Sequence, residues 1–190
     1  MRITVDIIND KEVVQYLKKL NSFEAPEACR KAVRATARKA PPRFSKYTRE
    51  RYTVKAARLK KDIGIKYIDR GFQALISTSY EPISMASFNV RKVSQGIRFN
   101  VYKGSPVNLR AGFMAKAPNH DTILPFARIT NKPYPIRVIM GPSAAGIALG
   151  ASKYGETIMD KCTRELSGEL SKEVKNAMAA MLRGFGRVTR

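Results

Sequence analysis

The stretch PYPIRVIMGPS, residues 133–143, decides the fold, because it is the point where a β-type pattern passes into a helical one. The apolar residues of 136–140 predict a strand that is punctuated by Pro and Gly. Ser143 or Ser152 is placed to cap the long helix that follows. Beyond them, apolar side chains recur every three or four residues, which is the spacing of one helical stripe. The stripe consists of Ile158, Met159, Cys162, Leu166, Leu170, Val174, Met178 and Met181.

Before this stretch, strands alternate with turns. The residues on both sides of Gly71, and those on both sides of Gln95-Gly96, show the alternation of half-buried strands joined by hairpins. Pro125 has no backbone N–H, so its strand is predicted to lie at a sheet edge. Residues 82–88 are interpreted as a short turn of helix and residues 103–106 as a loop. The predicted strands are 65–70, 72–77, 90–93, 97–102, 113–115, 124–129 and 136–140.

The first third of the chain is helical after a short strand at residues 3–7. Asp10 can cap a helix that runs to residue 20, and Pro26 lies in the first turn of the next helix, where its missing N–H costs nothing. Pro41 and Pro42 interrupt that helix. A second basic helical region follows over residues 44–61, and Gly64 ends it. The residues expected to be buried by the helix of Pro26 are Ala25, Cys29, Ala32, Val33 and Thr36.

These patterns predict an α+β fold, a mostly antiparallel β-sheet flanked by N-terminal helices and a long C-terminal helix. The chain has 190 residues, of which 44% are hydrophobic and 27% charged, so it has the size and composition of one globular domain. We therefore expect a single domain over residues 1–190. Its parts are a basic helical part (1–63), a β-rich part (64–141), the C-terminal helix (142–183) and a basic tail (184–190).

The formal net charge of +21 predicts an anionic partner, because like charges repel in a compact chain. Between Arg30 and Arg70 there are fifteen Lys and Arg and only three acids. The partner is either DNA or an acidic protein surface, and a solvated cationic surface without a partner is the third interpretation. The candidate contact residues are Arg30, Arg34, Arg38, Arg43, Lys46, Arg49, Arg51, Lys55, Arg58, Lys60 and Lys61.

Aromatic residues within the basic region allow two interpretations. Tyr47 and Tyr52 could stack on bases, as aromatics do in single-strand binders. We favour core packing, because Phe44 and Tyr47 share a helical face. The basic composition alone also fits a sequence-independent nucleic-acid-binding protein, such as a ribosome-associated or packaging factor.

Residues for catalysis, metal binding or membrane insertion are missing from the pattern. His120 is the only histidine and lies beside Asp121 in a loop, without a nucleophile motif. Residues 141–146 lack the Gly-Lys-Ser/Thr ending of a phosphate-binding loop, and the acids are scattered. Cys29 and Cys162 do not form a disulfide framework, so a reducing compartment is expected. We predict no enzyme activity, no metal or other cofactor, no signal peptide and no membrane span.

The order of several short segments along the chain is informative. An Ala- and Arg-rich helical third ends in ARLKK at residues 57–61, and PISMASF at 82–88 precedes a hairpin. VYKG at 101–104 is followed by AGFMA at 111–115, and YPIRVIMGPS at 134–143 leads into the C-terminal helix. In this order and spacing the segments resemble the minor tail protein Z family of long-tailed, siphovirus-type phages, also described as tail completion proteins. The resemblance spans the whole chain.

The resemblance implies a structural virion protein of the tail's neck region, assembled in the host cytoplasm, with no catalytic residues. Such proteins complete the head-proximal end of the tail and help the DNA end to reach its position at the head–tail junction. The implied partners are other copies of the chain in a ring, a hexamer under the symmetry of tails. The tail terminator, tail tube or head–tail connector proteins and the genomic DNA end, through non-specific contacts, complete the implied set.

Overall fold

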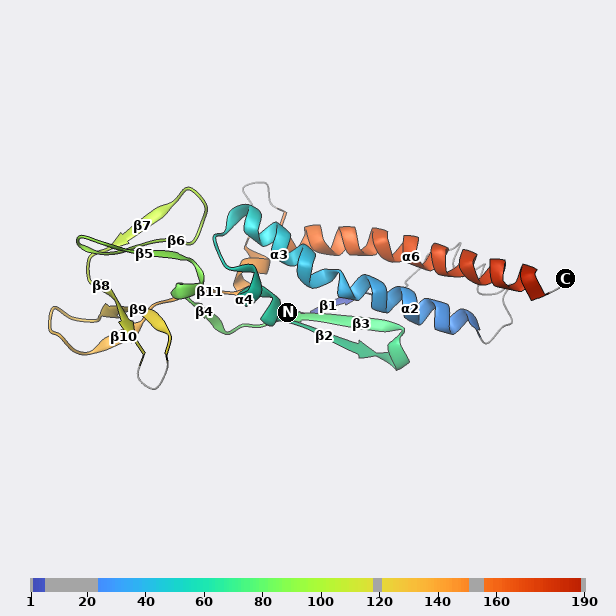
Figure 1. Ribbon diagram of the computed structural model, residues 1–190, viewed down its shortest axis with the longest axis horizontal. Coiled ribbons are helices and arrows are strands. Elements are labelled where there is room, and N and C mark those ends of the chain that lie inside the picture. Colours follow the sequence, from blue (N-terminus) through green and yellow to red (C-terminus); the bar gives the residue numbers. More distant parts are fainter. Residues whose placement is uncertain (1, 6–23, 118–120, 151–155, 189–190) are drawn as a thin grey trace. The chain divides into compact units, whose positions relative to one another are not determined.

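The computed structural model describes residues 2–5, 24–117, 121–150 and 156–188, and the side chains of 26–117, 121–150 and 156–180. The fold is α+β, as predicted (Figure 1). The chain forms two compact units, each with a core of its own. Unit 1 comprises Met1–Phe44, Ile63–Thr78 and Ala151–Arg190, and unit 2 comprises Ser45–Asp62 and Ser79–Gly150. The single-domain assignment stays a prediction.

Unit 1 combines a three-stranded antiparallel sheet with two long helices. The sheet has the order β1 (Arg2–Val5), β3 (Gln73–Thr78), β2 (Ile63–Ile68). The helices are α2 (Glu24–Arg38), which contacts β3, and α6 (Ile158–Val188), which contacts β1. A 3₁₀ turn, η1 (Asp69–Gly71), joins β2 to β3, and Gly71 has a φ of 96°, which glycine adopts without strain. The N-terminal strand is thus confirmed over residues 3–5, while residues 6 and 7 lie outside the described residues, and the hairpin at Gly71 is confirmed.

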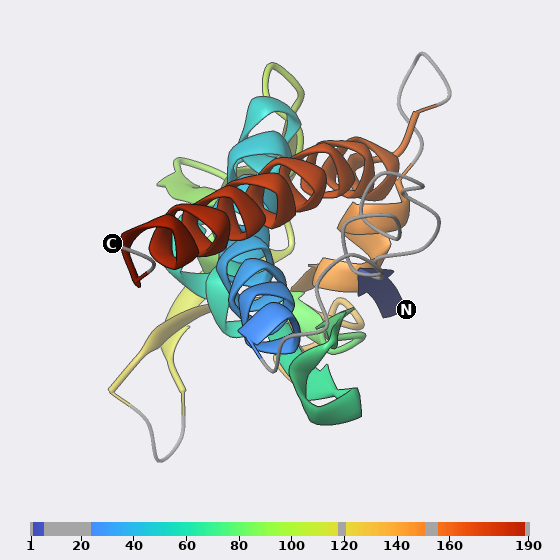
Figure 2. The ribbon, with the colours of Figure 1, turned by 90° about the vertical axis from the view of Figure 1, so that its right-hand side faces the viewer.

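The core of unit 1 lies between α2 and α6, which cross in Figure 2. The predicted stripe of α6 is buried from Ile158 through Met178. On α2 the predicted positions Cys29, Ala32, Val33 and Thr36 are buried as well. The side chains of Ala25 and Met181, and the predicted helix at 10–20, lie outside the described residues. The matching apolar stripes explain why these two helices pack on each other.

The start of α6 corrects one prediction. Its cap is Thr157, whose hydroxyl accepts a hydrogen bond from the Asp160 N–H (3.0 Å), while the Asp160 carboxylate accepts one from the Thr157 N–H (3.0 Å). This reciprocal pair satisfies two backbone donors of the first turn. Ser143 instead caps α5 (Ala144–Leu149), a short separate helix, by accepting a hydrogen bond from the Gly146 N–H (3.0 Å). Ser152 lies outside the described residues.

The basic helical region is divided into three helices rather than two. α2 ends at Arg38 and α3 (Ala40–Arg51) begins after Lys39, so that Pro41 and Pro42 lie in its first turn. The predicted interruption is therefore confirmed, whereas the continuous helix over 44–61 is wrong. Residues 52–55 separate α3 from α4 (Ala56–Lys61), because the Thr53 and Lys55 N–H groups donate to Val101 and Ser87. The predicted end at Gly64 is also wrong, since α4 ends at Lys61 and Gly64 lies within β2.

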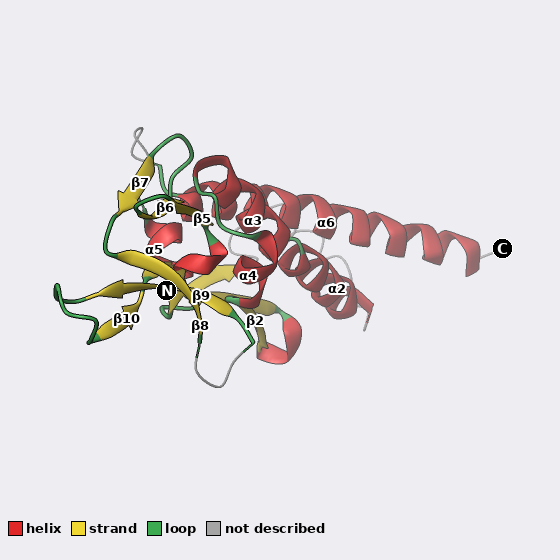
Figure 3. Cartoon of the chain, turned by 60° about the vertical axis from the view of Figure 1, so that its left-hand side comes forward, coloured by secondary structure: helices red, strands yellow, loops and turns green. Residues whose placement is uncertain are grey.

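Unit 2 consists of small antiparallel sheets and short helices (Figure 3). The hairpin at Gly96 is confirmed: its φ is 95°, and a Cβ there would lie 2.1 Å from the Leu109 carbonyl oxygen. Residues 82–88 split into a strand and a 3₁₀ turn, η2 (Met85–Ser87), and residues 136–140 split between two strands. The sheets have the orders β5 (Asn89–Val93), β6 (Gly96–Asn100), β7 (Pro106–Leu109); β10 (Ile136–Val138), β9 (Ile123–Arg128), β8 (Gly112–Lys116); and β11 (Met140–Ser143), β4 (Pro82–Ser84).

Pro125 lies in a central strand, so the predicted edge position is wrong. β9 pairs with both β8 and β10. The Pro125 carbonyl accepts from the Ile139 N–H (2.9 Å), so both backbone groups of Pro125 point toward the β10 side, where β10 has already ended at Val138. An N–H at this position would point beyond the last residue of β10. Its absence in Pro125 therefore removes no hydrogen bond between β9 and β8.

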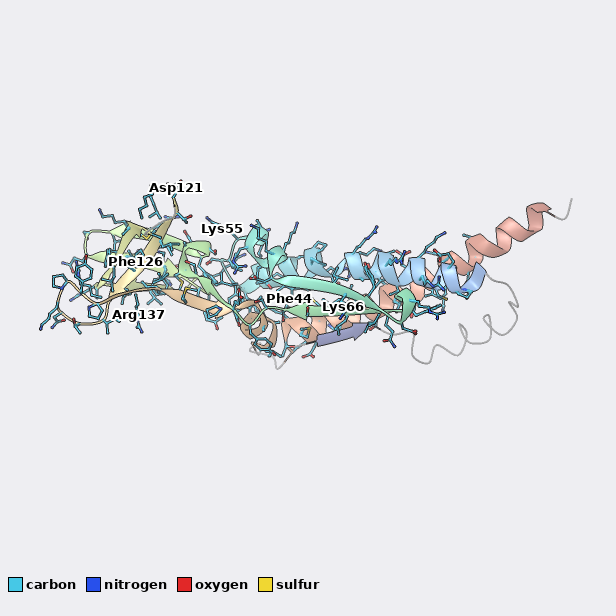
Figure 4. The ribbon with its side chains drawn as sticks, turned by 90° about the horizontal axis from the view of Figure 1, so that it is seen from below. Phe44, Lys55, Lys66, Asp121, Phe126 and Arg137 are labelled. Atoms are coloured by element: carbon cyan, nitrogen blue, oxygen red, sulfur yellow. The ribbon has the colours of Figure 1, made fainter. Side chains whose placement is uncertain are left out.

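The core of unit 2 includes the fully buried Ile83, Ile97 and Ile147. Phe126 stacks on Phe113 with ring centroids 5.9 Å apart, and in Figure 4 it lies between the exposed Asp121 and Arg137. Tyr47, Tyr52, Val54 and Leu59 of the basic region are also buried in this unit. The core interpretation of the two tyrosines is confirmed.

Candidate basic interaction surface

The two units carry their charge differently. Unit 1 has 20 Lys and Arg against 11 acids, a net formal charge of +9, whereas unit 2 has 16 against four, a net of +12. Of the predicted contact residues, Arg30, Arg34, Arg38 and Arg43 belong to unit 1 and the others to unit 2. The predicted set is therefore divided between the two units.

The arginines of α2 face the β2–β3 hairpin. The Arg30 guanidinium lies 4.9 Å from the ring centroid of Phe72, and that of Arg34 lies 5.9 Å from the ring of Tyr67. Arg30 also pairs with Glu27 at 3.3 Å. Cations over aromatic faces are attracted by the ring quadrupole. These two arginines therefore attach the helix to the hairpin, although Arg34 is still exposed, and Arg38 is exposed as well.

Glutamates of α6 bind two cations at the α2–α3 junction. Lys39 Nζ lies 2.7 Å from Glu173 and 3.5 Å from Glu169, and the hydrogen bond to Glu173 is the largest cause that raises the pKa of Lys39. Arg43 pairs with Glu165 at 2.5 Å and also with Glu169. The charge of Arg43 is thus balanced within unit 1. Lys39 was not among the predicted contact residues. The sequence held a signal for it, because Lys39 and Arg43 are four residues apart, as are the successive glutamates of α6.

In unit 2 the cations of α3 and α4 point mostly to solvent. Arg51 is half-buried, and Lys46 lies 5.7 Å from the ring of Tyr47. Arg58 pairs with Asp62, whose side chain is buried, so Arg58 neutralises a carboxylate of its own unit. The exposed cations of this segment are Lys46, Arg49, Lys55, Lys60 and Lys61.

The hairpins of unit 2 add cations that sequence reasoning missed. Arg91 lies directly opposite Arg98 in the β5–β6 register, and Arg98 donates to the Asn108 side chain at 2.7 Å. Like charges at opposed positions destabilise a sheet. The signal was available, because residues 79–150 hold nine Lys and Arg but only Glu81 and Asp121 as acids. The exposed hairpin cations are Arg91, Lys92, Arg98, Lys103, Arg110, Lys116, Arg128, Lys132 and Arg137.

The other candidate chemistry has little support in the described part of the chain. His120 lies outside it, and Asp121 is exposed and pairs with Lys116 at 2.8 Å. Within the described ranges no three His, Cys, Asp or Glu side chains group to hold a metal ion, and no helix is long and apolar enough to cross a membrane. Burial raises the pKa of Cys29, and burial is the main cause that raises the pKa of Cys162 to about 12, so both thiols stay protonated at neutral pH.

Comparison with known proteins identifies the chain's relatives. No curated protein and no solved structure matches it. The family model of the prophage minor tail protein Z (GPZ) matches residues 11–185, which include both units almost entirely. This span agrees with the motif order of residues 57–143. The chain therefore belongs to the prophage minor tail protein Z family, a family of structural proteins of the phage tail.

Proposed function

We propose that this tail protein completes the head-proximal end of the tail and helps to hold the DNA end at the head–tail junction. Its family supports a place in the tail. The DNA contact is inferred from the charge of unit 2, which has 16 Lys and Arg but only four acids. Most of the cations of α3, α4 and the hairpins are exposed. Copies in a head-to-tail ring, a hexamer under tail symmetry, would multiply this charge around the duplex.

The contacts are to phosphates and do not read sequence. Lys and Arg that neutralise phosphates release condensed counterions, which gives affinity for any duplex. A protein that holds a DNA end has no need of base-specific hydrogen bonds. The structure divides the predicted set: Arg30, Arg34, Arg43 and Arg58 already have partners within their units. Within unit 2, Lys46 also lies over the ring of Tyr47, so we assign the phosphate contacts to Arg49, Arg51, Lys55, Lys60 and Lys61.

A phage that carries Arg49, Lys60 and Lys61 all changed to Gln tests this function. All three side chains are exposed, and Gln keeps helix propensity while it removes charge. We expect tails that assemble and join heads but retain the DNA end poorly, with low infectivity. The matched control changes Lys31, Lys66 and Lys172, exposed cations of unit 1, to Gln and should remain close to wild type.

Other outcomes separate the alternatives. If the surface instead docks on an acidic neighbour such as the tail terminator or a head–tail connector protein, the triple variant will be missing from purified tails, because an unpaired charge at a buried contact is costly. A free nucleic-acid-binding protein would sediment with bulk nucleic acid and leave it with salt. Normal tails with normal infectivity would contradict the proposed role.

A further inference from the structure

An exposed tyrosine of unit 2 rests on a buried one. Tyr52, at the end of α3, is 5% exposed, whereas Tyr102, just after β6, is 55% exposed. Their ring centroids lie 4.8 Å apart with the planes tilted by 36°. Tyr102 therefore has a supported ring and still offers more than half of its surface to solvent.

The position of Tyr102 is fixed by backbone hydrogen bonds. Tyr52 and Tyr102 form an antiparallel bridge. The Lys103 N–H donates to the Arg51 carbonyl at 2.8 Å, and the Thr53 N–H donates to the Val101 carbonyl at 3.1 Å. A ring held in this way loses little conformational entropy when a ligand stacks on it.

Each of the two segments carries a cation next to its tyrosine in the chain. Lys103, which follows Tyr102, is exposed, and Arg51, which precedes Tyr52, is half-buried. The loop beyond is open, since a Cβ placed on Gly104 would meet no atom within 4 Å. Exposed aromatic rings on a surface that also carries Lys and Arg are typical of proteins that bind single-stranded nucleic acid, where bases stack on the rings and phosphates contact the cations.

We propose that Tyr102 is a stacking platform for an unpaired nucleobase, with Arg51 and Lys103 on the adjoining phosphates. Bases inside a duplex stack on one another, so only an unpaired nucleotide offers a free face. Stacking tolerates any base, which agrees with contacts that do not read sequence. The inference rests on the proposed DNA contact and adds to it a preference for DNA ends that carry unpaired nucleotides.

Fluorescence anisotropy with the purified full-length protein tests this preference. The probes are a labelled blunt duplex and the same duplex with a single-stranded extension of about ten nucleotides. We expect wild type to bind the extended DNA more tightly. Tyr102→Leu, which keeps apolar cover over Tyr52, should weaken binding to the extended DNA by about 5- to 100-fold and leave blunt DNA within about twofold. Tyr102→Phe should bind as wild type does.

Tyr134→Leu is the matched control, since Tyr134 is 74% exposed in the same unit. It should leave both affinities unchanged. Equal affinities of wild type and Tyr102→Leu for the extended DNA would overturn the inference, and so would an equal loss on both DNAs. If the leucine variant has a lower Tm, Tyr102→Trp decides: its larger ring must bind the extension at least as tightly as wild type. Failure of wild type to bind either DNA would instead overturn the proposed function.

Discussion

The two units use their basic residues in opposite ways. In unit 1, Lys39 and Arg43 pair with glutamates of α6, and arginines of α2 cover aromatic rings. Unit 2 has 16 cations and only four acids, and two of these acids, Asp62 and Asp121, pair with Arg58 and Lys116. One basic stretch of sequence therefore makes most of its packing contacts before residue 44, where Lys31 and Arg38 are nevertheless exposed, and contributes mostly surface charge after it. Unit 2 carries the larger share of the net charge, +12 against +9 in unit 1.

The largest expected effect comes from a charge placed in the core of unit 1. Leu170 is buried in the α6 stripe, so Leu170→Asp should lower the free energy of unfolding by at least about 3 kcal/mol, because an unpaired buried charge is costly. Urea unfolding followed by circular dichroism measures this. Ser167→Asp, at an exposed position of the same helix, is the control and should cost less than about 1 kcal/mol. An unchanged midpoint for Leu170→Asp would mean that the stripe is not core.

Thiol reactivity reports on unit 1 alone, because both cysteines belong to it. Burial raises the pKa of both thiols, that of Cys162 to about 12, and the thiolate is the reactive form. At pH 8 Cys162 of the native protein should react with a disulfide reagent at least about 100-fold more slowly than in the urea-unfolded chain, since each pKa unit changes the thiolate fraction tenfold, and Cys29 should also react more slowly than when unfolded. Fast reaction of either thiol in native buffer would show that α2 and α6 are not closely packed.

Removing Arg43 should cost less than a core charge but more than a surface substitution. Its guanidinium pairs with Glu165 and Glu169 and is about a quarter exposed, so Arg43→Gln should lower the free energy of unfolding by about 1–2 kcal/mol. Arg38→Gln, an exposed arginine of the same region, should change it by less than about 0.5 kcal/mol. Equal effects of the two variants would contradict the division between paired and exposed cations.

The smallest expected effect is a gain of stability in unit 2. Arg91 faces Arg98 across the β5–β6 pair, so Arg91→Thr should raise the stability of unit 2 by about 0.2–0.5 kcal/mol. Asn89→Thr, on the same face of β5, controls for the β-propensity of threonine. A larger gain for Asn89→Thr than for Arg91→Thr would indicate that the opposed arginines do not repel measurably.

The sequence was informative wherever a pattern is local. The α6 stripe and the hairpins at Gly71 and Gly96 follow from periods and turn residues within a few positions. The break at residues 52–55 could not be predicted, because the Thr53 N–H finds its acceptor at Val101, far along the chain. The central place of Pro125 depended on where β10 ends, which no local rule gives. Tertiary pairing decided both cases.

The candidate surface shows the same limit. Counting charges along the chain was enough to predict an anionic partner, since charge excess is a property of composition. It could not separate Arg43 from Arg49, because Glu165, the partner of Arg43, lies 122 positions away. The glutamates of α6 showed only that the helix is mixed in charge. The exposed cations of β5 and β6 lie outside the helical region in which Lys and Arg are densest, so the charge excess between Arg30 and Arg70 did not indicate them.

The salt dependence of DNA binding tests most directly the central claim that the exposed cations of unit 2 contact phosphates. The affinity for a blunt duplex is measured over a range of salt concentrations for wild type and for the two triple Gln variants. If Arg49, Lys60 and Lys61 each contact one phosphate, their variant should reduce the slope of log K against log salt by about 3. The Lys31, Lys66 and Lys172 variant should reduce it by less than about 1. Equal slopes for the two variants would contradict the account.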